Sequence, residues 1–219
     1  MFEDRADAGK QLGNALQPRY GDRADVIVLA LPRGGVPVGF EVAHILNAPL
    51  DVFVSRKLGV PGHEELAMGA IASGGAIVFN EDVVRSLGIP RQAIDRVIER
   101  ERIELERRER AFRGDRPPRD FRGRTVILVD DGLATGASMH AAIQAVRTQN
   151  PAAVVVAVPA AARETCLRLR SYADAVVCLE TPEPFYAVSS WYEDFEQTSD
   201  DEVRELLARA DREAIHAGH

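Results

Sequence analysis

The chain has 219 residues, of which 46% are hydrophobic, and a formal net charge of −7. This length can bury one sizeable core, so we expect a single domain over residues 1–219. The acidic balance disfavours a broad basic surface for nucleic acid or an anionic membrane. The sequence shows neither a signal-peptide pattern at its start nor an apolar run of about 18 residues, which predicts a soluble, cytoplasmic protein.

Two cysteines occur, Cys166 and Cys178, both in apolar surroundings. Their spacing matches neither a C-x-x-C motif nor a metal-ligand pattern. We therefore expect reduced thiols in the core.

Apolar runs of strand length alternate with longer helical patterns along most of the chain. The predicted strands are 26–31, 52–55, 125–129, 153–158 and 175–179, and the predicted helices between them are 38–46, 137–147 and 163–171. Nearly continuous apolar strands are typical of a parallel sheet covered on both faces. The pattern therefore predicts an α/β fold with an open, doubly wound, mostly parallel sheet.

Residues 59–122 interrupt this alternation and are predicted to form an inserted lobe with a flexible loop and helices. Gly74 and Gly75 predict a tight hairpin turn between strands 67–72 and 76–79. Asn80 is a candidate cap for a short helix. Pro90 precedes a helix over about 91–113, whose charges predict a solvated face with ion pairs between neighbouring turns. The apolar stripe of that helix is a candidate dimer contact, and it contains Ile94, Ile98, Leu105 and Phe112.

A loop that can bind phosphate follows the predicted strand 125–129. Thr135 and Ser138 supply hydroxyl donors, and Gly136 lets the backbone approach an anion closely. The helix that follows directs unpaired N–H groups at the same point. Residues 134–138 therefore predict a phosphate site at the carboxyl edge of the sheet.

Two carboxylates, Asp130 and Asp131, precede this loop directly. Carboxylates beside a phosphate site would repel the anion unless they have another partner. They can accept hydrogen bonds from vicinal hydroxyls or help to hold a divalent cation through water. A phosphorylated sugar with a 2,3-diol satisfies both parts of the motif.

The stretch Val126-Ile127-Leu128-Val129-Asp130-Asp131-Gly132-Leu133-Ala134-Thr135-Gly136-Ala137-Ser138-Met139 resembles the phosphoribosyl pyrophosphate signature of type I phosphoribosyltransferases, particularly the adenine and orotate branches. The resemblance implies the type I phosphoribosyltransferase fold, in which residues 180–219 would form a C-terminal hood. It also implies that Asp130 and Asp131 contact the ribose, and that the 5′-phosphate is enclosed by Ala134, Thr135, Gly136, Ala137 and Ser138. Magnesium would be bound through pyrophosphate and ribose, without an assigned protein ligand. A homodimer is the implied assembly.

Two further loops support this resemblance. Arg33, Gly34 and Gly35 follow the first predicted strand, where the glycines permit an unusual backbone and the arginine can neutralise phosphate. Arg56 and Lys57 end the second predicted strand, within a stretch similar to the Arg-Lys-x-Gly-x-x-Pro-Gly motif of adenine phosphoribosyltransferases. All five residues are candidate pyrophosphate ligands, although a glycine turn and a solvated strand end are the structural alternatives.

The acceptor side of the site is less explicit. After Pro61 the resemblance implies a mobile loop that closes over substrates, with Glu64 and Glu65 as candidate catalytic carboxylates. The aromatic segment 184–195 loosely resembles the hood that binds the base in purine enzymes. Its candidate base-binding residues are Tyr186, Val188 and Trp191.

The sequence departs from the hypoxanthine-guanine branch at two places. Ala134 replaces the acid that those enzymes carry in the phosphate loop, and residues 151–162 contain no lysine to bind a purine oxygen. The insertion over about 74–121 also exceeds what a minimal adenine enzyme has. These departures disfavour a 6-oxopurine acceptor and leave the acceptor base unassigned.

The predicted function is therefore transfer of a phosphoribosyl group from magnesium-bound phosphoribosyl pyrophosphate to a nitrogenous, nucleobase-like acceptor, with release of pyrophosphate. A non-catalytic phosphoribosyl pyrophosphate sensor that keeps the ligand loops is the main alternative. The third possible function is hydrolysis of a phosphorylated sugar.

Overall fold

A parallel five-stranded sheet forms the centre of the molecule in the computed structural model, which describes the backbone of residues 1–217 and the side chains of residues 1–213. The strands lie in the order β2-β1-β6-β7-β8. Their bounds are β1 Val26–Ala30, β2 Leu50–Val52, β6 Thr125–Val129, β7 Ala153–Ala160 and β8 Ala175–Glu180. This arrangement confirms the predicted fold class and four of the five predicted core strands.

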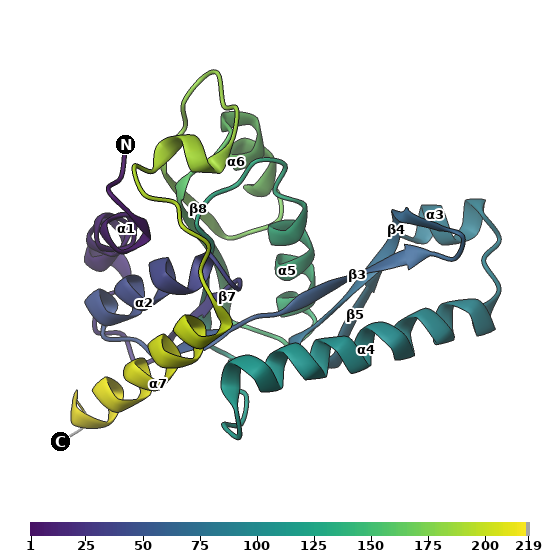
Figure 1. Cartoon of the computed structure of the whole chain (residues 1–219), viewed down its shortest axis with the longest axis horizontal. Helices are drawn as coiled ribbons and strands as arrows, with labels where there is room; N and C mark the ends of the chain where they lie inside the picture. Colours follow the sequence, from purple (N-terminus) through teal and green to yellow (C-terminus); the bar gives the residue numbers. More distant parts are fainter. Residues whose placement is uncertain (218–219) are drawn as a thin grey trace.

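Helices cover both faces of this sheet (Figure 1). One face carries α1 (Arg5–Tyr20), α2 (Gly35–Leu46) and α7 (Asp200–Ala217), and the other carries α5 (Ala137–Arg147) and α6 (Arg163–Leu169). Alternate residues of the central strands enter different clusters: Val28 and Ile127 face α1 and α2, whereas Val126 faces α5.

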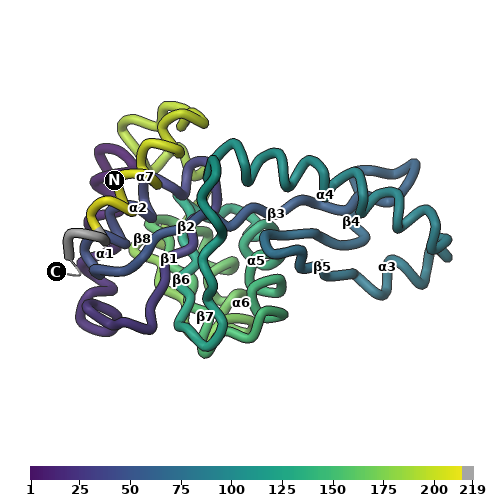
Figure 2. The backbone as a smooth tube through the Cα atoms, turned by 90° about the horizontal axis from the view of Figure 1, so that it is seen from below, coloured from purple at the N-terminus to yellow at the C-terminus, as the bar shows by residue number. Residues whose placement is uncertain are grey.

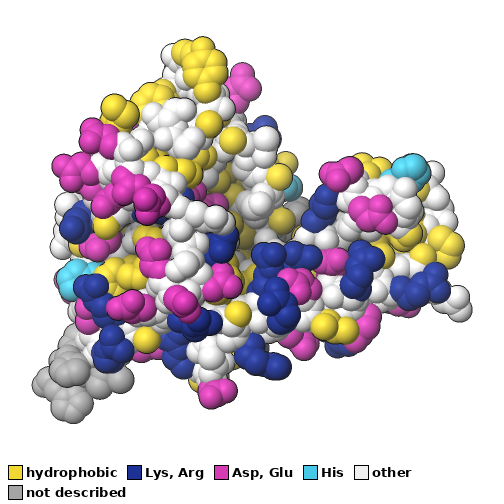
Figure 3. All heavy atoms as spheres, viewed as in Figure 1, with side chains coloured by type: hydrophobic (Ala, Val, Ile, Leu, Met, Phe, Trp, Pro, Cys, Tyr) yellow, Lys and Arg dark blue, Asp and Glu magenta, His cyan; other side chains and the backbone are white. Residues whose placement is uncertain are grey.

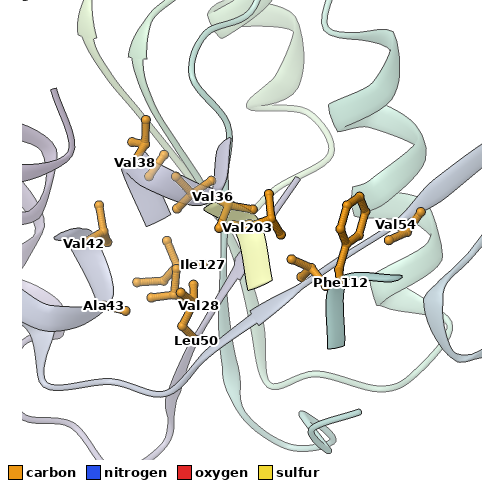
Figure 4. Packing of buried hydrophobic residues seen from close by; sticks show 14 of the residues in the cluster. Val28, Val36, Val38, Val42, Ala43, Leu50, Val54, Phe112, Ile127 and Val203 are labelled. Atoms are coloured by element: carbon orange, nitrogen blue, oxygen red, sulfur yellow. The ribbon is translucent and has the colours of Figure 1, made fainter. Parts of the chain in front are cut away.

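The packing of the first cluster explains why the central strands are apolar throughout. Val28 and Ile127 lie beside Val36 and Val42 of α2 in the close view (Figure 4). Every residue of β6 is at most 5% exposed. Truncation of such a side chain, for example Ile127→Ala, should cost about 2–5 kcal/mol.

A second sheet projects from the core as an arm (Figures 1 and 2). It is antiparallel, in the order β3-β4-β5, with β3 Ser55–Val60, β4 His63–Ala72 and β5 Ala76–Phe79. Two helices, α3 (Glu81–Ser86) and α4 (Arg91–Arg113), complete the arm. The predicted hairpin turn is confirmed, because Gly74 and Gly75 both have positive φ angles, of 80° and 77°.

The predicted strand 52–55 is wrong. Strand β2 ends at Val52 and β3 begins at Ser55, in a different sheet. Phe53 and Val54 between them are buried at 1% and 3% exposure. Because the connection is as buried as strand β2 before it, hydrophobicity did not reveal the break.

The flexible loop expected after Pro61 is strand β4 in the structure. Gly69 of this strand pairs with Leu58 on one side and Phe79 on the other. A Cβ atom at Gly69 would overlap the carbonyl oxygen of Val78. This glycine therefore permits close strand packing.

The apolar stripe of α4 is buried inside the chain, which corrects its proposed role as a dimer contact. Ile94, Leu105 and Phe112 are 6%, 2% and 4% exposed and belong to the main core cluster. The opposite face of α4 carries interspersed basic and acidic side chains (Figure 3). Glu104 pairs there with Arg107 and Arg108, as predicted for a solvated face.

The two cysteines form a disulfide, contrary to the expected reduced thiols. Cys166 lies on α6 and Cys178 on β8, with their Cα atoms 6.8 Å apart. The chain returns from α6 to the neighbouring strand within 12 residues, and this brings the side chains together. Sequence spacing alone does not show that return.

Candidate active site

The strand order places the predicted ligand loops side by side. With core strands in the order 2-1-3-4-5, the topological switch point lies between β1 and β6, where ligands of open α/β sheets bind. The loop after β1 leads into α2, on one face. The loop after β6 leads into α5, on the opposite face of the sheet.

Gly34 and Gly35 lie directly against the acidic pair. A Cβ atom at Gly34 would overlap Asp131 Oδ2, and one at Gly35 would lie 2.8 Å from the carbonyl oxygen of Val129. The loop also contains a cis peptide bond between Pro32 and Arg33. The sequence suggested that these glycines let a ligand approach the backbone closely. The packing of the loop against the acidic pair also requires residues without a Cβ atom.

The acidic pair is only partly compensated. Burial raises the pKa of Asp130 well above its usual value, and the charge of Asp131 raises it further. Burial also raises the pKa of Asp131, although Arg5 opposes this effect. The Asp131 N–H donates to Asp130 Oδ1 at 2.9 Å. Hydroxyl donors or a cation at this point would stabilise both ionised carboxylates.

Arg5 is a site residue that the sequence analysis did not identify. Its Nε donates to Asp131 Oδ2 at 2.9 Å, and its Nη1 donates to the carbonyl oxygen of Glu196 at 2.6 Å. The guanidinium also lies 3.8 Å from the centre of the Phe195 ring. Arg5 thus joins the first helix, the acidic pair and the C-terminal segment. No local motif marks it, because Asp131 is 126 residues away.

The loop 134–138 leads directly into the N-terminus of α5. Gly136 caps α5 with φ at 69°, and the N–H groups of the first helical turn follow it. Ala134, Thr135, Ala137 and Ser138 are exposed, so the loop is open to a ligand. Its other side contacts Thr165 and Arg168 of α6, two further residues that sequence analysis missed.

The predicted pyrophosphate ligands with positive charge do not converge on one point. Arg33 faces Asp200 at 3.4 Å, Arg56 faces Glu101 at 2.7 Å, and Lys57 faces Glu65 at 3.9 Å. Each cation has a partner from a different element: α7, α4 and β4. Of the three, only Arg33 belongs to the loop that touches the acidic pair.

The two predicted catalytic glutamates lie in the outer part of the arm. Glu64 and Glu65 are exposed near the start of β4, beside the turn where Val60 pairs with His63. The other end of the β3–β4 hairpin, where Ser55 pairs with Ala72, adjoins the core. The structure does not bring either glutamate to the acidic pair.

The aromatic C-terminal segment covers the loop after β6. Val188 packs so closely on Gly132 that a Cβ atom there would lie 2.5 Å from Val188 Cγ1. The Tyr192 hydroxyl donates to the carbonyl oxygen of Asp131 at 2.6 Å, a contact not predicted from sequence. Trp191 Nε1 is buried without an acceptor among the described residues, and Tyr186 is 83% exposed.

Two absences concern the described residues alone. They contain no group of three or more His, Cys, Asp or Glu side chains placed to hold a metal ion. None of the described helices combines the length and apolar character that a membrane crossing requires.

Comparison with known proteins agrees with this geometry. The model of the phosphoribosyl transferase domain family matches residues 6–202. Two Mycobacterium tuberculosis proteins, named "Putative phosphoribosyl transferase" MT0597 and Rv0571c, are each 50% identical over 218 residues, which is 100% of this chain and 49% of theirs. The chain thus spans about half the length of these curated relatives.

A solved structure extends the similarity to three dimensions. The crystal structure of TT1426 from Thermus thermophilus is 44% identical in sequence and superposes with a TM-score of 0.84. The match covers 95% of this chain and 98% of that one. The family match, the parallel sheet and the loops at its switch point agree, and the chain belongs to the phosphoribosyl transferase domain family.

Proposed function

We propose that this protein is a phosphoribosyltransferase that transfers the phosphoribosyl group of magnesium-bound phosphoribosyl pyrophosphate to a nitrogenous base. The observation that carries the proposal is the contact of Gly34 with Asp131 at the switch point. It joins the candidate pyrophosphate loop to the candidate ribose carboxylates, and the phosphate loop follows within the same β6–α5 connection.

Each part of the donor would have its own partner. Asp130 and Asp131 would accept hydrogen bonds from the ribose hydroxyls, and residues 134–138 with the first turn of α5 would hold the 5′-phosphate. Arg33 and the backbone of Gly34 and Gly35 would contact the pyrophosphate. Holding both ends of the sugar fixes the anomeric carbon while its bond to pyrophosphate breaks and the bond to the acceptor nitrogen forms.

The carboxylates at the site would provide only some of the oxygen ligands of a magnesium ion. Mg²⁺ prefers oxygen ligands and usually keeps waters while sharing substrate phosphates. Asp130 and Asp131 would supply the protein oxygens, through water or the ribose, and the charge of the cation would offset the burial that raises the pKa of both groups. When bound, the ion would neutralise charge on the leaving pyrophosphate.

The remaining candidate site residues lie in the C-terminal segment and on the arm. Val188 and Trp191 lie in the segment that covers the β6–α5 loop, and they remain candidates for contact with the base, together with Tyr186. Arg56 and Lys57 remain candidates for pyrophosphate binding. Arg56 and Lys57 lie near the end of the arm that adjoins the core, whereas the candidate bases Glu64 and Glu65 lie at its outer end and would need the arm to move toward the core.

The direct test is pyrophosphate release from phosphoribosyl pyrophosphate and Mg²⁺ with a panel of purines, pyrimidines and simple amines. We expect release that requires one acceptor and is lost in the D130N/D131N double variant. Release without any acceptor would instead indicate hydrolysis of the sugar phosphate. No release and no donor binding would contradict the proposal.

One observation favours the alternative of a non-catalytic sensor. Ala134 offers no carboxylate in the loop, and the candidate bases Glu64 and Glu65 lie on the outer arm. Binding of phosphoribosyl pyrophosphate without pyrophosphate release, across the whole panel, would support that alternative.

We also propose a cytoplasmic homodimer. The buried stripe of α4 is excluded as its contact, but Ile103 on the same helix is 60% exposed and is a candidate. Sedimentation equilibrium of the wild type and of an Ile103→Lys variant would test this, and a monomeric wild type would contradict it.

A further inference from the structure

We propose that Thr165 and Arg168 of α6 are positioning residues that hold the phosphate loop in its anion-binding shape. This inference rests on the proposed function of the loop as the 5′-phosphate site. Neither residue belongs to the loop itself or to the stretch that identified it.

The first observation is that α6 binds two successive carbonyl groups of the loop. The Thr165 hydroxyl donates to the Ala134 carbonyl oxygen at 2.6 Å, and Arg168 Nη2 donates to the Thr135 carbonyl oxygen at 2.5 Å. A carbonyl oxygen that accepts from α6 cannot also point at the ligand, where it would repel an anion. The two hydrogen bonds therefore favour a loop that presents N–H groups and hydroxyls to the phosphate.

The second observation is that Thr165 also fills the space beside the cap of α5. Its Cγ2 atom would lie 2.6 Å from a Cβ atom at Gly136, so it packs directly against the backbone at the helix N-terminus. Thr165 is only 3% exposed. One side chain thus fixes both the Ala134 carbonyl and the position of Gly136.

The third observation concerns charge. Arg168 is exposed and forms no ion pair with any carboxylate of the described residues, unlike Arg33 and Arg56. Its Nη2 would lie 3.9 Å from a Cβ atom at Gly136. The pKa of His140, on the first turn of α5, is lowered by burial and then by the charge of Arg168. The positive charge therefore lies beside the glycine cap of α5.

The fourth observation is that α6 is itself held in place. Cys166, between the two positioning residues, is bonded to Cys178 of β8, and Leu169 is 1% exposed in the core. A helix fixed on both sides can impose a geometry on the loop at little entropic cost to binding.

The test is the affinity of the full chain for ribose 5-phosphate, measured by calorimetry for the wild type, R168Q and R170Q. Arg170 is the matched control, because it caps the same helix, is exposed, and has a side chain without a hydrogen bond or ion pair within the described part of the chain. We expect R168Q to bind about tenfold more weakly, as for one lost charge-assisted hydrogen bond, and R170Q to bind like the wild type. R168K should recover most of the affinity.

Three readouts separate positioning of this loop from a general structural role. Affinity for inorganic pyrophosphate, which lacks the 5′-phosphate, should be unchanged in R168Q. In turnover assays R168Q should raise KM for phosphoribosyl pyrophosphate more than it lowers kcat, because the phosphate is bound equally in ground and transition states. T165V, which removes the hydroxyl and keeps a methyl group, should weaken ribose 5-phosphate binding, and T165S, which keeps the hydroxyl, should bind more tightly than T165V.

The outcomes distinguish this inference from the proposed function. If the wild type binds ribose 5-phosphate and R168Q binds it as R170Q does, the positioning role is wrong and the proposed function stands. If the wild type binds neither ribose 5-phosphate nor phosphoribosyl pyrophosphate, both are wrong. Should R168Q fail to fold, the T165V and T165S pair provides the same comparison.

Discussion

The guanidinium of Arg5 and the carboxylate of Asp131 form an ion pair 126 residues apart in sequence, with side chains only 11% and 16% exposed. Arg5 is the cation that compensates the acidic pair in this structure. Its removal therefore tests how the site tolerates two adjacent carboxylates.

We expect Arg5→Gln to lower the free energy of unfolding by about 3 kcal/mol at neutral pH, because a buried carboxylate loses its partner. The pKa of Asp131, already raised by burial, should rise further. A carboxyl group whose pKa is raised by folding destabilises the folded state above its unfolded-state pKa, and the penalty disappears at lower pH, so the loss should shrink as pH falls. Urea unfolding at several pH values measures this.

Lys10→Gln is the matched control for Arg5→Gln. Lys10 lies on the same helix, is exposed, and has a side chain without a hydrogen bond or ion pair among the described residues. Equal effects of the two substitutions would show that the ion pair contributes nothing.

Asp130→Asn should stabilise the protein while it prevents donor binding. Burial and the charge of Asp131 raise the pKa of Asp130 in the folded state, so the folded protein releases this proton less readily than the unfolded chain does. Asparagine has a similar shape and no charge. The stabilisation should therefore grow as pH rises above the unfolded-state pKa of Asp130, and vanish at lower pH, where Asp130 is protonated in both states.

Thermal unfolding across pH measures this effect, with Tm rising by about 2–4 °C for each kcal/mol gained. Asp131→Asn is the contrast, because it breaks the pair with Arg5 and should not stabilise. A lower Tm for D130N at neutral pH would contradict the assignment of an unfavourable buried charge.

Gly34→Ala should weaken the binding of phosphoribosyl pyrophosphate by more than about tenfold and lower Tm. The added Cβ would overlap Asp131 Oδ2, so the pyrophosphate loop or the carboxylate must move. Gly62→Asn is the control, since no atom lies within 4 Å of a Cβ there and asparagine tolerates its φ of 79°. Wild-type affinity in G34A would show that the loop and the acid need not be in contact.

Reduction of the disulfide should lower the free energy of unfolding by about 3 kcal/mol, the chain-entropy estimate for a loop of this size. The two cysteines are 12 residues apart, and Cys166 anchors α6. Thermal unfolding with and without a reductant measures the loss, and the C166S/C178S double variant should not respond to reductant. Two free thiols in the purified, denatured protein would contradict the pairing.

The elements that the sequence predicted well are those whose signal is local. Strands β1, β6, β7 and β8 are nearly all apolar because helices cover both faces, and α5 follows a glycine cap with an amphipathic pattern. The break at Phe53 and Val54 escaped prediction, since both residues are as buried as strand β2 before them. Residues 67–72 of β4 were predicted as a strand, but residues 63–66, which extend it, were expected to belong to a mobile loop.

The residues of the candidate site also fall into those that the sequence identified and those that it did not. Gly34, Gly35, Asp130, Asp131 and residues 134–138 were identified from sequence, because glycines, acids and hydroxyls recur within two short loops. Partners from distant segments could not be identified: they are Arg5, Tyr192, Thr165 and Arg168, at separations of 126, 61, 31 and 33 residues from the groups they bind.

The sequence by itself determined the parallel sheet and the two loops at its carboxyl edge, because apolar periodicity and loop chemistry are encoded by neighbouring residues. Only the tertiary structure decided what surrounds those loops. Arg5 reaches Asp131, α6 binds the carbonyls of Ala134 and Thr135, and the candidate cations Arg33 and Arg56 turn to carboxylates on other elements. Such contacts depend on the packing of whole helices against the sheet, which no short stretch of residues specifies.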